Sequence, residues 1–260
     1  SVEDIRRNEG TIRNIRLWDH EPLLTTFAQL QEIRTYYDFK DVDNDRYWLD
    51  GIYRQVSLSP RELSYTNLPS QSWINHHLNY THGYALCLGP VNESTSEGLP
   101  NLFIKNIPPI STTNIQVARP EVYYGEMGNE YCIVNSRAQE FDYPSGNQNV
   151  YSTYEGTGGL RIDNLLRRLL FAIKFKETKI LLSQDIQPES RVMIYRRVME
   201  RGQRLTPFIE FDQDPYMVID KEGHLWWMLD GYTISGQFPY SEPVKPGLNY
   251  IRNSVKVTVN

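Results

Sequence analysis

The sequence predicts an α+β protein, built mainly of antiparallel β-hairpins and sheets with three or four amphipathic helices. Strand-like runs meet around tight turns, while the three- to four-residue apolar spacing of a helix occurs in only a few segments. Strands and helices are partly segregated along the chain, whereas a parallel sheet requires them to alternate. We expect two subregions, residues 1–150 with a helix and hairpins, and residues 151–260 with two helices and a hairpin.

In the first subregion, Asp19 is expected to cap a helix from about Pro22 to Tyr37. A hairpin should follow around Asp50-Gly51, because this dipeptide tolerates the positive φ values of a type I′ turn. The remaining elements expected here are a short helix over 70–78, a buried strand over 83–91, a second hairpin around Gly128-Asn129, and an ordered loop over 141–159. The apolar face of the first helix is Leu23, Phe27, Leu30, Ile33 and Tyr37.

The second subregion opens with a helix that carries a near-ideal apolar stripe, the pattern by which a surface helix packs on a core. A second helix is expected from Pro188 to about Leu205, with a short strand at residues 179–184 between the two. The segment that follows, up to the end of the chain, is predicted to form strands. The apolar stripe of the helix that opens this subregion consists of Ile162, Leu165, Leu166, Leu169, Leu170 and Ile173.

Composition and charge exclude several classes of protein. Of 260 residues, 40% are hydrophobic and 23% charged, which is ordinary for a globular chain. No apolar run reaches the roughly 20 residues of a membrane helix. The net charge is −5, yet residues 160–204 hold eleven Lys/Arg and five Asp/Glu. That basic stretch either complements the acidic remainder or offers a face to an anionic partner such as lipid headgroups. Nucleic acid is excluded as a partner by the acidic total and the lack of a matching motif.

Residues 73–100 concentrate three of the five histidines. Their spacing fits neither HExxH nor a paired Cys/His metal site. His82 follows a polar hinge at Tyr80 and precedes a buried strand, so it could act as an acid or base, with Glu93 of the next loop as a carboxylate. It could equally hydrogen-bond the turn. There is no GxSxG motif, and Ser145 is an isolated turn serine.

Two further motifs allow a binding site. Asp41, Asp43 and Asp45 alternate as at the start of a calcium loop, but Arg46 and Ile52 replace the Gly and Glu that such a loop needs. A solvated turn is favoured, and no metal or cofactor is predicted. Residues 154–159 place glycines before the expected helix, where exposed amides and arginines can bind an anion. The anion candidates are Gly158, Gly159, Arg161 and Arg168, although a flexible entry to the helix is favoured.

Cys87 and Cys132 both lie in apolar strand-like runs. They fit either one disulfide or two buried thiols, and the second alternative is favoured because free cysteine behaves as a small hydrophobic residue.

Long motifs over the whole chain resemble one known family, a bacterial integral-membrane family filed as an uncharacterised protein family. Several transmembrane helices precede a large extracytoplasmic region in that family, and this chain is similar to the first part of that region. The resemblance implies no activity, cofactor or catalytic residue. The motifs that carry it include WINHHLNYTHGY, PVNESTSEGLP, RPEVYYGE, EFDYPSG, YEGTGG and LLRRLLFAIKF.

The resemblance implies a bacterial cell membrane, with this domain on the extracytoplasmic side as a soluble fragment of a larger membrane protein. The leading hypothesis is a noncatalytic binding or assembly module. Its partners would be its own transmembrane region and an envelope protein or anionic lipid headgroups. One alternative is a hydrolase-like envelope enzyme that uses His82 with nearby carboxylates. Another is anion or lipid-headgroup binding through the basic helices.

Overall fold

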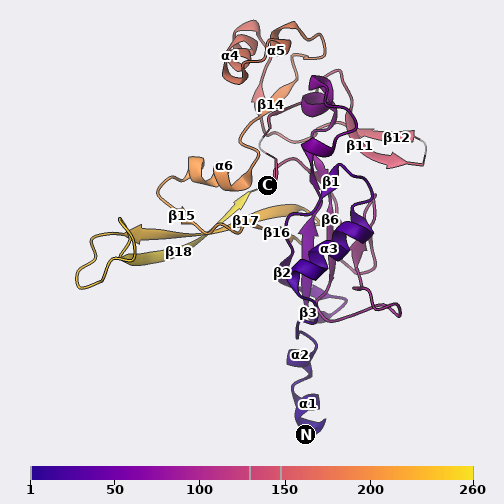
Figure 1. The fold of residues 1–260 in the computed structure, drawn as a ribbon, viewed down its shortest axis with the longest axis vertical. Helices are drawn as coiled ribbons and strands as arrows, with labels where there is room; N and C mark the ends of the chain where they lie inside the picture. The colour runs from indigo at the N-terminus through magenta and orange to yellow at the C-terminus, as the bar shows by residue number, and fades with distance from the viewer. Residues whose placement is uncertain (1, 129, 147, 260) are drawn as a thin grey trace.

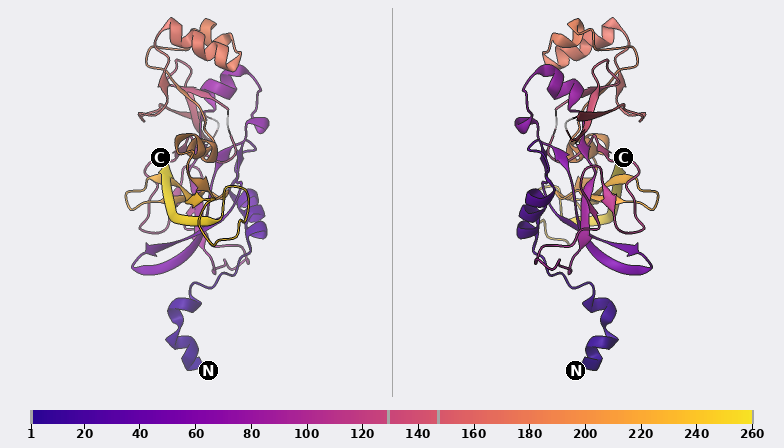
Figure 2. Two further views of the ribbon diagram at one scale, coloured as in Figure 1. Left: turned by 90° about the vertical axis from the view of Figure 1, so that its left-hand side faces the viewer. Right: turned by 90° about the vertical axis from the view of Figure 1, so that its right-hand side faces the viewer.

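The computed structural model describes residues 2–128, 130–146 and 148–259, which form an elongated molecule (Figure 1). Two pairs of short helices occupy its opposite ends, and a long two-stranded ribbon projects to one side (Figures 1 and 2). Separate helices and several small antiparallel sheets confirm the predicted α+β class. The end helices are α1 (Val2–Arg7) and α2 (Glu9–Ile12), opposite α4 (Leu165–Phe175) and α5 (Lys179–Leu182); the ribbon is β17 (Leu225–Ser235) and β18 (Tyr250–Val259).

A five-stranded antiparallel sheet forms the body of the molecule, in the order β2-β3-β6-β7-β8. The hairpin predicted around Asp50-Gly51 joins its first two strands, and the φ angles of 49° and 82° at these residues are those of a type I′ turn. The strands are β2 (Asp43–Leu49), β3 (Ile52–Pro60), β6 (Leu86–Pro90), β7 (Ile104–Lys105) and β8 (Ile110–Ser111).

Helix α3 (His20–Gln31) packs beside this sheet through Leu23 and Phe27. Asp19 caps it as predicted, because its carboxylate accepts the His20 N–H at 3.0 Å. The predicted end at Tyr37 is wrong. Ile33 has a φ of 62°, which no helix accommodates, so the helix stops and Ile33 stays exposed. Tyr37 is buried instead in β1 (Tyr37–Asp38), which pairs with β4 (Glu62–Leu63).

The C-terminal strands form a second antiparallel sheet, as predicted for the end of the chain. Both β15 (Glu210–Phe211) and β16 (Tyr216–Ile219) pair with β17, and β18 pairs along its other edge. Helix α6 (Val198–Leu205) packs against this sheet, where Gly202 leaves room for the Leu229 side chain. Trp227 and Leu229 share one apolar core with Leu58 of the five-stranded sheet.

Two predictions for the second subregion are wrong. The prediction of a single helix from Pro188 to Leu205 is wrong, because the first part of this segment is β14 (Arg191–Met193) and only α6 is helical. Val192 of β14 is buried and pairs with Ile133, so a tertiary contact overrides the local helical preference. The strand expected at residues 179–184 is wrong as well, since residues 179–182 form α5. Strand β14 lies between β10 (Cys132–Val134) and β13 (Leu160–Arg161).

The apolar stripe predicted around α4 does form on a helix, but it does not face the core. Only Ile162, which precedes the helix, is buried. The other five members of the stripe are exposed, because α4 packs on the core through Phe171, Ala172 and Phe175 instead.

The hairpin expected around Gly128-Asn129 does not form. Its two arms pair elsewhere: β9 (Glu121–Val122) pairs with β5 (Gly83–Tyr84), and β10 pairs with β14. Asn129 itself lies outside the described residues. The segment 141–159 is not only a loop, because β11 (Glu140–Ser145) and β12 (Gln148–Ser152) form a hairpin within it.

The remaining elements partly match expectation. The short helix of residues 70–78 is represented by one π-helical segment, Asn75–Asn79, after the 3₁₀ turn Tyr65–Asn67. The strand expected over 83–91 is buried throughout as predicted, but Ala85 divides it into β5 and β6 with its φ of 56°.

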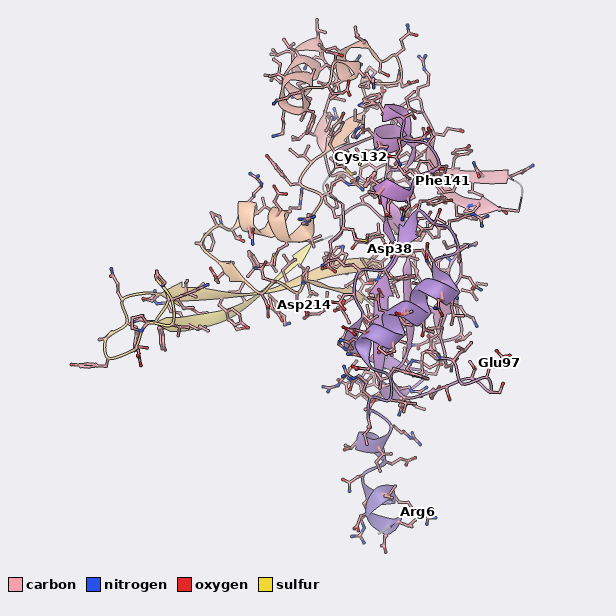
Figure 3. The ribbon with its side chains drawn as sticks, viewed as in Figure 1. Arg6, Asp38, Glu97, Cys132, Phe141 and Asp214 are labelled. Atoms are coloured by element: carbon pink, nitrogen blue, oxygen red, sulfur yellow. The ribbon has the colours of Figure 1, made fainter. Side chains whose placement is uncertain are left out.

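Cys87 and Cys132 are both buried free thiols in separate core clusters, which decides between the two alternatives for the cysteines. Cys132 is labelled in Figure 3. The division at residue 150 stays a prediction, although β10 and β14 pair across it. Within the three described ranges, no helix is both long and apolar enough to cross a bilayer.

Candidate functional site

A pocket of about 550 Å³ lies between the loop of residues 153–158, the segment that follows β9, helix α6 and one end of the C-terminal sheet. This volume lies within the usual range for small-molecule sites, roughly 300–1,000 Å³. The lining residues are Arg119, Glu121, Val122, Tyr123, Tyr124, Thr153, Tyr154, Glu155, Gly156, Thr157, Gly158, Arg201, Met217, Leu225, Trp227 and Val259.

The 153–158 loop folds around the phenol of Tyr154. The Tyr154 hydroxyl accepts the Gly158 N–H at 2.8 Å. A Cβ at Gly156 would lie 2.3 Å from the same hydroxyl oxygen, so the turn requires glycine there. This is why the glycines singled out in the sequence occur at this point: they let the chain wrap closely around a ring.

Part of the lining is apolar. Trp227 is buried, and its indole N–H donates to the Tyr124 carbonyl at 2.8 Å. Val122, Met217 and Val259 also line the pocket and belong with Trp227 to the main core cluster. The pocket therefore combines an apolar floor, formed by core side chains, with polar residues of its rim.

The charged groups of the rim balance one another. Arg119 forms an ion pair with Glu155. The guanidinium of Arg201 lies 4.7 Å from the centroid of the Tyr124 ring, a cation–π contact. Burial raises the pKa of the phenols of Tyr123 and Tyr154, so both stay protonated at neutral pH. The Tyr123 hydroxyl donates to Glu140 at 3.0 Å, and the Tyr154 hydroxyl accepts the Gly158 N–H. Among the described residues that line the pocket there is no histidine, cysteine, serine or lysine.

The structure does not bring the four anion candidates together. Only Gly158 lines the pocket. The carbonyls of Gly158 and Gly159 accept from Arg191 at 3.1 and 3.2 Å, so this backbone binds a cation and not an anion. Arg168 donates to the Ile186 carbonyl at 2.7 Å, while Arg161 lies exposed in β13. Helix α4 begins at Leu165, beyond the two glycines and Arg161, and Asn164 caps it by accepting the Arg167 N–H. Arg168 lies within this helix.

The three catalytic candidates are also separated. Tyr80 packs on the ring of Phe141 at a centroid distance of 5.0 Å. Glu93 forms an ion pair with Arg54 and accepts from Asn101 at 3.1 Å. The hydrogen-bond partners of His82 are the Gly83 carbonyl and the Ser152 hydroxyl, so the pairing of His82 with Glu93 does not occur in this fold.

His82 is buried and has two hydrogen-bond partners. Its Nδ1 lies 3.0 Å from the Gly83 carbonyl, and its Nε2 lies 3.2 Å from the Ser152 hydroxyl. This arrangement fixes the tautomer that donates from Nδ1 and accepts from serine. Burial lowers the pKa of His82 to about 4, so the imidazole is neutral and weakly basic at pH 7. Sequence spacing gave no sign of Ser152, because the two residues lie 70 positions apart.

The three aspartates proposed for a metal share a shallow hollow with His20 and with Asp214, the residue labelled in Figure 3. Burial, and then the charges of Asp214, Glu126 and Asp41, raise the pKa of Asp43 to about 8. The Asp41 carboxylate accepts the Val42 N–H at 2.7 Å, which stabilises the local turn. Among the described residues, no three His, Cys, Asp or Glu side chains are arranged to hold a metal ion.

The fold and the pocket together define an α+β protein with a pocket of mixed polar, apolar and aromatic lining. The chain belongs to the uncharacterised protein family UPF0182, whose family model matches residues 1–260 and confirms the predicted resemblance. It is 56% identical to UPF0182 proteins of Geobacter sp. strain M21 and of Pelobacter propionicus, over 100% of the chain and 29% of each relative. A UPF0182 protein of Pelotomaculum thermopropionicum is 54% identical, again over 29% of its length.

The chain therefore spans less than a third of the relatives it matches. No solved structure matches it.

Proposed function

We propose that the chain is a noncatalytic binding module of a larger bacterial membrane protein, exposed outside the cytoplasm. The observation that carries this proposal is the pocket beside the 153–158 loop, whose lining combines aromatic and apolar side chains with two arginines and two glutamates. Such a lining offers hydrogen bonds and apolar contact but no strong base or nucleophile. The other partners in this proposal are the transmembrane region of the same protein and another protein of the cell envelope.

The ligand class that suits this pocket is a neutral saccharide. The charged residues of the lining are two arginines and two glutamates, so the pocket carries no net charge that would attract an ion. Sugars present hydroxyl groups on their edges and C–H groups on their faces, and these match the tyrosine rim and the apolar floor with Trp227.

Isothermal titration calorimetry with maltose and N,N′-diacetylchitobiose tests the proposal, with glucuronate as the charged comparison. We expect saturable binding of at least one neutral sugar and none of glucuronate. Arg201→Ala should weaken that binding, because it removes a rim group that lies over Tyr124. The matched control is Arg197→Ala at the start of the same helix, outside the lining. Absence of heat with every sugar, or equal loss in both variants, would refute the pocket as a saccharide site.

A second candidate, a serine hydrolase, is favoured by one contact. The Ser152 hydroxyl lies 3.2 Å from Nε2 of His82, the geometry of a nucleophile beside its base. A fluorophosphonate probe should label Ser152 if this pair is catalytic, and Ser152→Ala should abolish the label. No labelling of the folded chain supports the binding module; labelling that depends on both Ser152 and His82 would replace it with an enzyme.

A further inference from the structure

Helix α4 presents its most apolar side chains to solvent. Five aliphatic residues on it are between 43% and 72% exposed. Leu182 of the neighbouring α5 is 77% exposed and extends this surface. We call the resulting surface the α4–α5 face; its members are Leu165, Leu166, Leu169, Leu170, Ile173 and Leu182.

This exposure does not result from a poorly packed helix. The other side of α4 is firmly held, since Phe171, Ala172 and Phe175 join a core cluster with Ile133. The ring of Phe175 stacks on Tyr131 at a centroid distance of 4.0 Å. At about 100° per residue, the five exposed side chains cover an arc of roughly 140° that points away from this packed side. Helix α4 therefore has two apolar sides, one that packs on the core and one that is free to contact a partner.

The helix is also cationic. From Leu165 to its C-cap Lys176 it contains Arg167, Arg168, Lys174 and Lys176, and no Asp or Glu. Arg167 pairs with Asp163, just before the helix, and Lys174 donates to the Tyr195 hydroxyl. Arg167, Lys174 and Lys176 are exposed beside the apolar arc, so aliphatic and positive groups lie together on one surface.

The position of the face suits a flat partner. Figures 1 and 2 show α4 and α5 at one end of the elongated molecule, with no other element beyond them. A planar surface can therefore reach the whole length of α4 without meeting the projecting β17–β18 ribbon, which leaves the body further down.

We propose that the α4–α5 face docks on the surface of an anionic lipid bilayer. Helix α4 would lie in the plane of the interface, with its leucines among the upper acyl chains and its lysine and arginine groups at the headgroups. Charge decides between this partner and a second copy of the chain, because two cationic helices repel each other whereas anionic headgroups attract them. The proposal goes beyond the saccharide pocket and does not depend on it.

Vesicle flotation of the 260-residue chain tests the docking. The probes are vesicles of phosphatidylcholine alone and of phosphatidylcholine with phosphatidylglycerol at 3:1. We expect binding to the anionic vesicles at least tenfold stronger than to the neutral ones, given about 1 kcal/mol for each basic residue near the surface.

Two variants separate the apolar and the ionic contributions. The double variant Leu166→Ser with Ile173→Ser should lower the partition coefficient by roughly tenfold or more, because two inserted aliphatic groups are lost. The double variant Lys174→Gln with Lys176→Gln should weaken anionic binding by roughly fivefold per charge and flatten its salt dependence. The apolar substitutions should leave the thermal midpoint unchanged, since these side chains are already exposed.

The matched control is Ile110→Ser with Val244→Ser, two aliphatic side chains that are 54% and 82% exposed but lie outside the α4–α5 face. This control should float like the unmodified chain. No flotation with either vesicle, or equal flotation of the control and the Leu166/Ile173 variant, would overturn the proposal. A lipid-free dimer in sedimentation that the Leu166/Ile173 variant dissociates would also overturn it, by showing that a second copy covers the face.

Discussion

Replacing the buried Arg196 should be among the most destabilising single changes in this chain. Only 4% of this residue is exposed, and it joins segments that are far apart in the sequence. Its Nε donates to the Tyr123 carbonyl at 2.7 Å, and its two terminal nitrogens donate to the Thr81 carbonyl and the Tyr65 hydroxyl. A weaker contact reaches the Glu130 carbonyl at 3.5 Å.

The magnitude follows from these partners. Arg196→Met fills similar space but donates nothing, so the carbonyls of Tyr123 and Thr81 lose a charged donor inside the protein. A buried acceptor left without a partner costs about 1–3 kcal/mol. With the Tyr65 hydroxyl and the Glu130 carbonyl also affected, we expect a loss of about 3–5 kcal/mol, similar to breaking a buried ion pair. The whole free energy of unfolding of a folded domain is about 5–15 kcal/mol, so this loss is large.

Urea denaturation followed by far-UV circular dichroism measures the effect. The midpoint should fall while the slope m is unchanged, because the surface exposed on unfolding is the same. Arg196→Lys should give an intermediate loss, since one ammonium group cannot reach all the acceptors at once.

The adjacent Arg197 provides the control. Its side chain is exposed, so Arg197→Met should change the free energy of unfolding by no more than about 0.5 kcal/mol. A loss below about 1 kcal/mol for Arg196→Met would refute the reasoning, because it would mean that water or relaxation satisfies the abandoned carbonyls.

Two further substitutions and one thiol titration have expected outcomes that the structure determines. Burial raises the pKa of Asp142 to about 7, so the protonated carboxyl favours the folded state at low pH, and this contribution to stability is lost as the pH rises to 7. Asp142→Asn should therefore raise the free energy of unfolding by about 1–3 kcal/mol at pH 8 and by little at pH 4, as measured from urea midpoints. Cys87 and Cys132 should react with DTNB only after denaturation, and then as two thiols. Gly125→Ala should cost about 2–4 kcal/mol, because its Cβ would lie 2.1 Å from the buried carboxylate of Glu62.

Each of these has its own contrary result. A gain from Asp142→Asn that does not depend on pH would show that the carboxyl is not the titrating group. Fewer than two thiols in denaturant without reductant would indicate a disulfide. Gly10→Ala is the control for Gly125, since nothing lies within 4 Å of its added Cβ; equal effects at both positions would contradict the steric argument.

Local chemistry determined the elements that need only their own neighbours. The Asp50-Gly51 turn formed as predicted, because two successive positive φ values depend on the turn residues themselves. Asp19 likewise caps α3 within one residue of itself. Long motifs over the whole chain, among them those of residues 73–84 and 154–159, also sufficed to recognise the family that the comparison confirms.

The pairing partners of the β-strands could not be predicted from local sequence in the same way. The segment Arg191–Met193 lies inside a run that reads as helical, but it is a strand because Ile133 and its neighbours offer a buried edge. The hairpin expected around Gly128 failed for the same reason, as each arm found a better partner far away in sequence. The pocket shows this most strongly, since its lining comes from positions between Arg119 and Val259. Spacing singled out only its glycine loop.

By itself, the sequence determined that α4 would be an amphipathic helix, because the spacing of its leucines is a local property. It could not determine which side would be buried. Phe175 stacks on the ring of Tyr131, and Phe171 stacks on Phe175, so these two take the inward position and leave Leu166 and Ile173 outside. Only the tertiary structure decided this, because a helix with two apolar sides buries the one whose shape fits the surface beneath it.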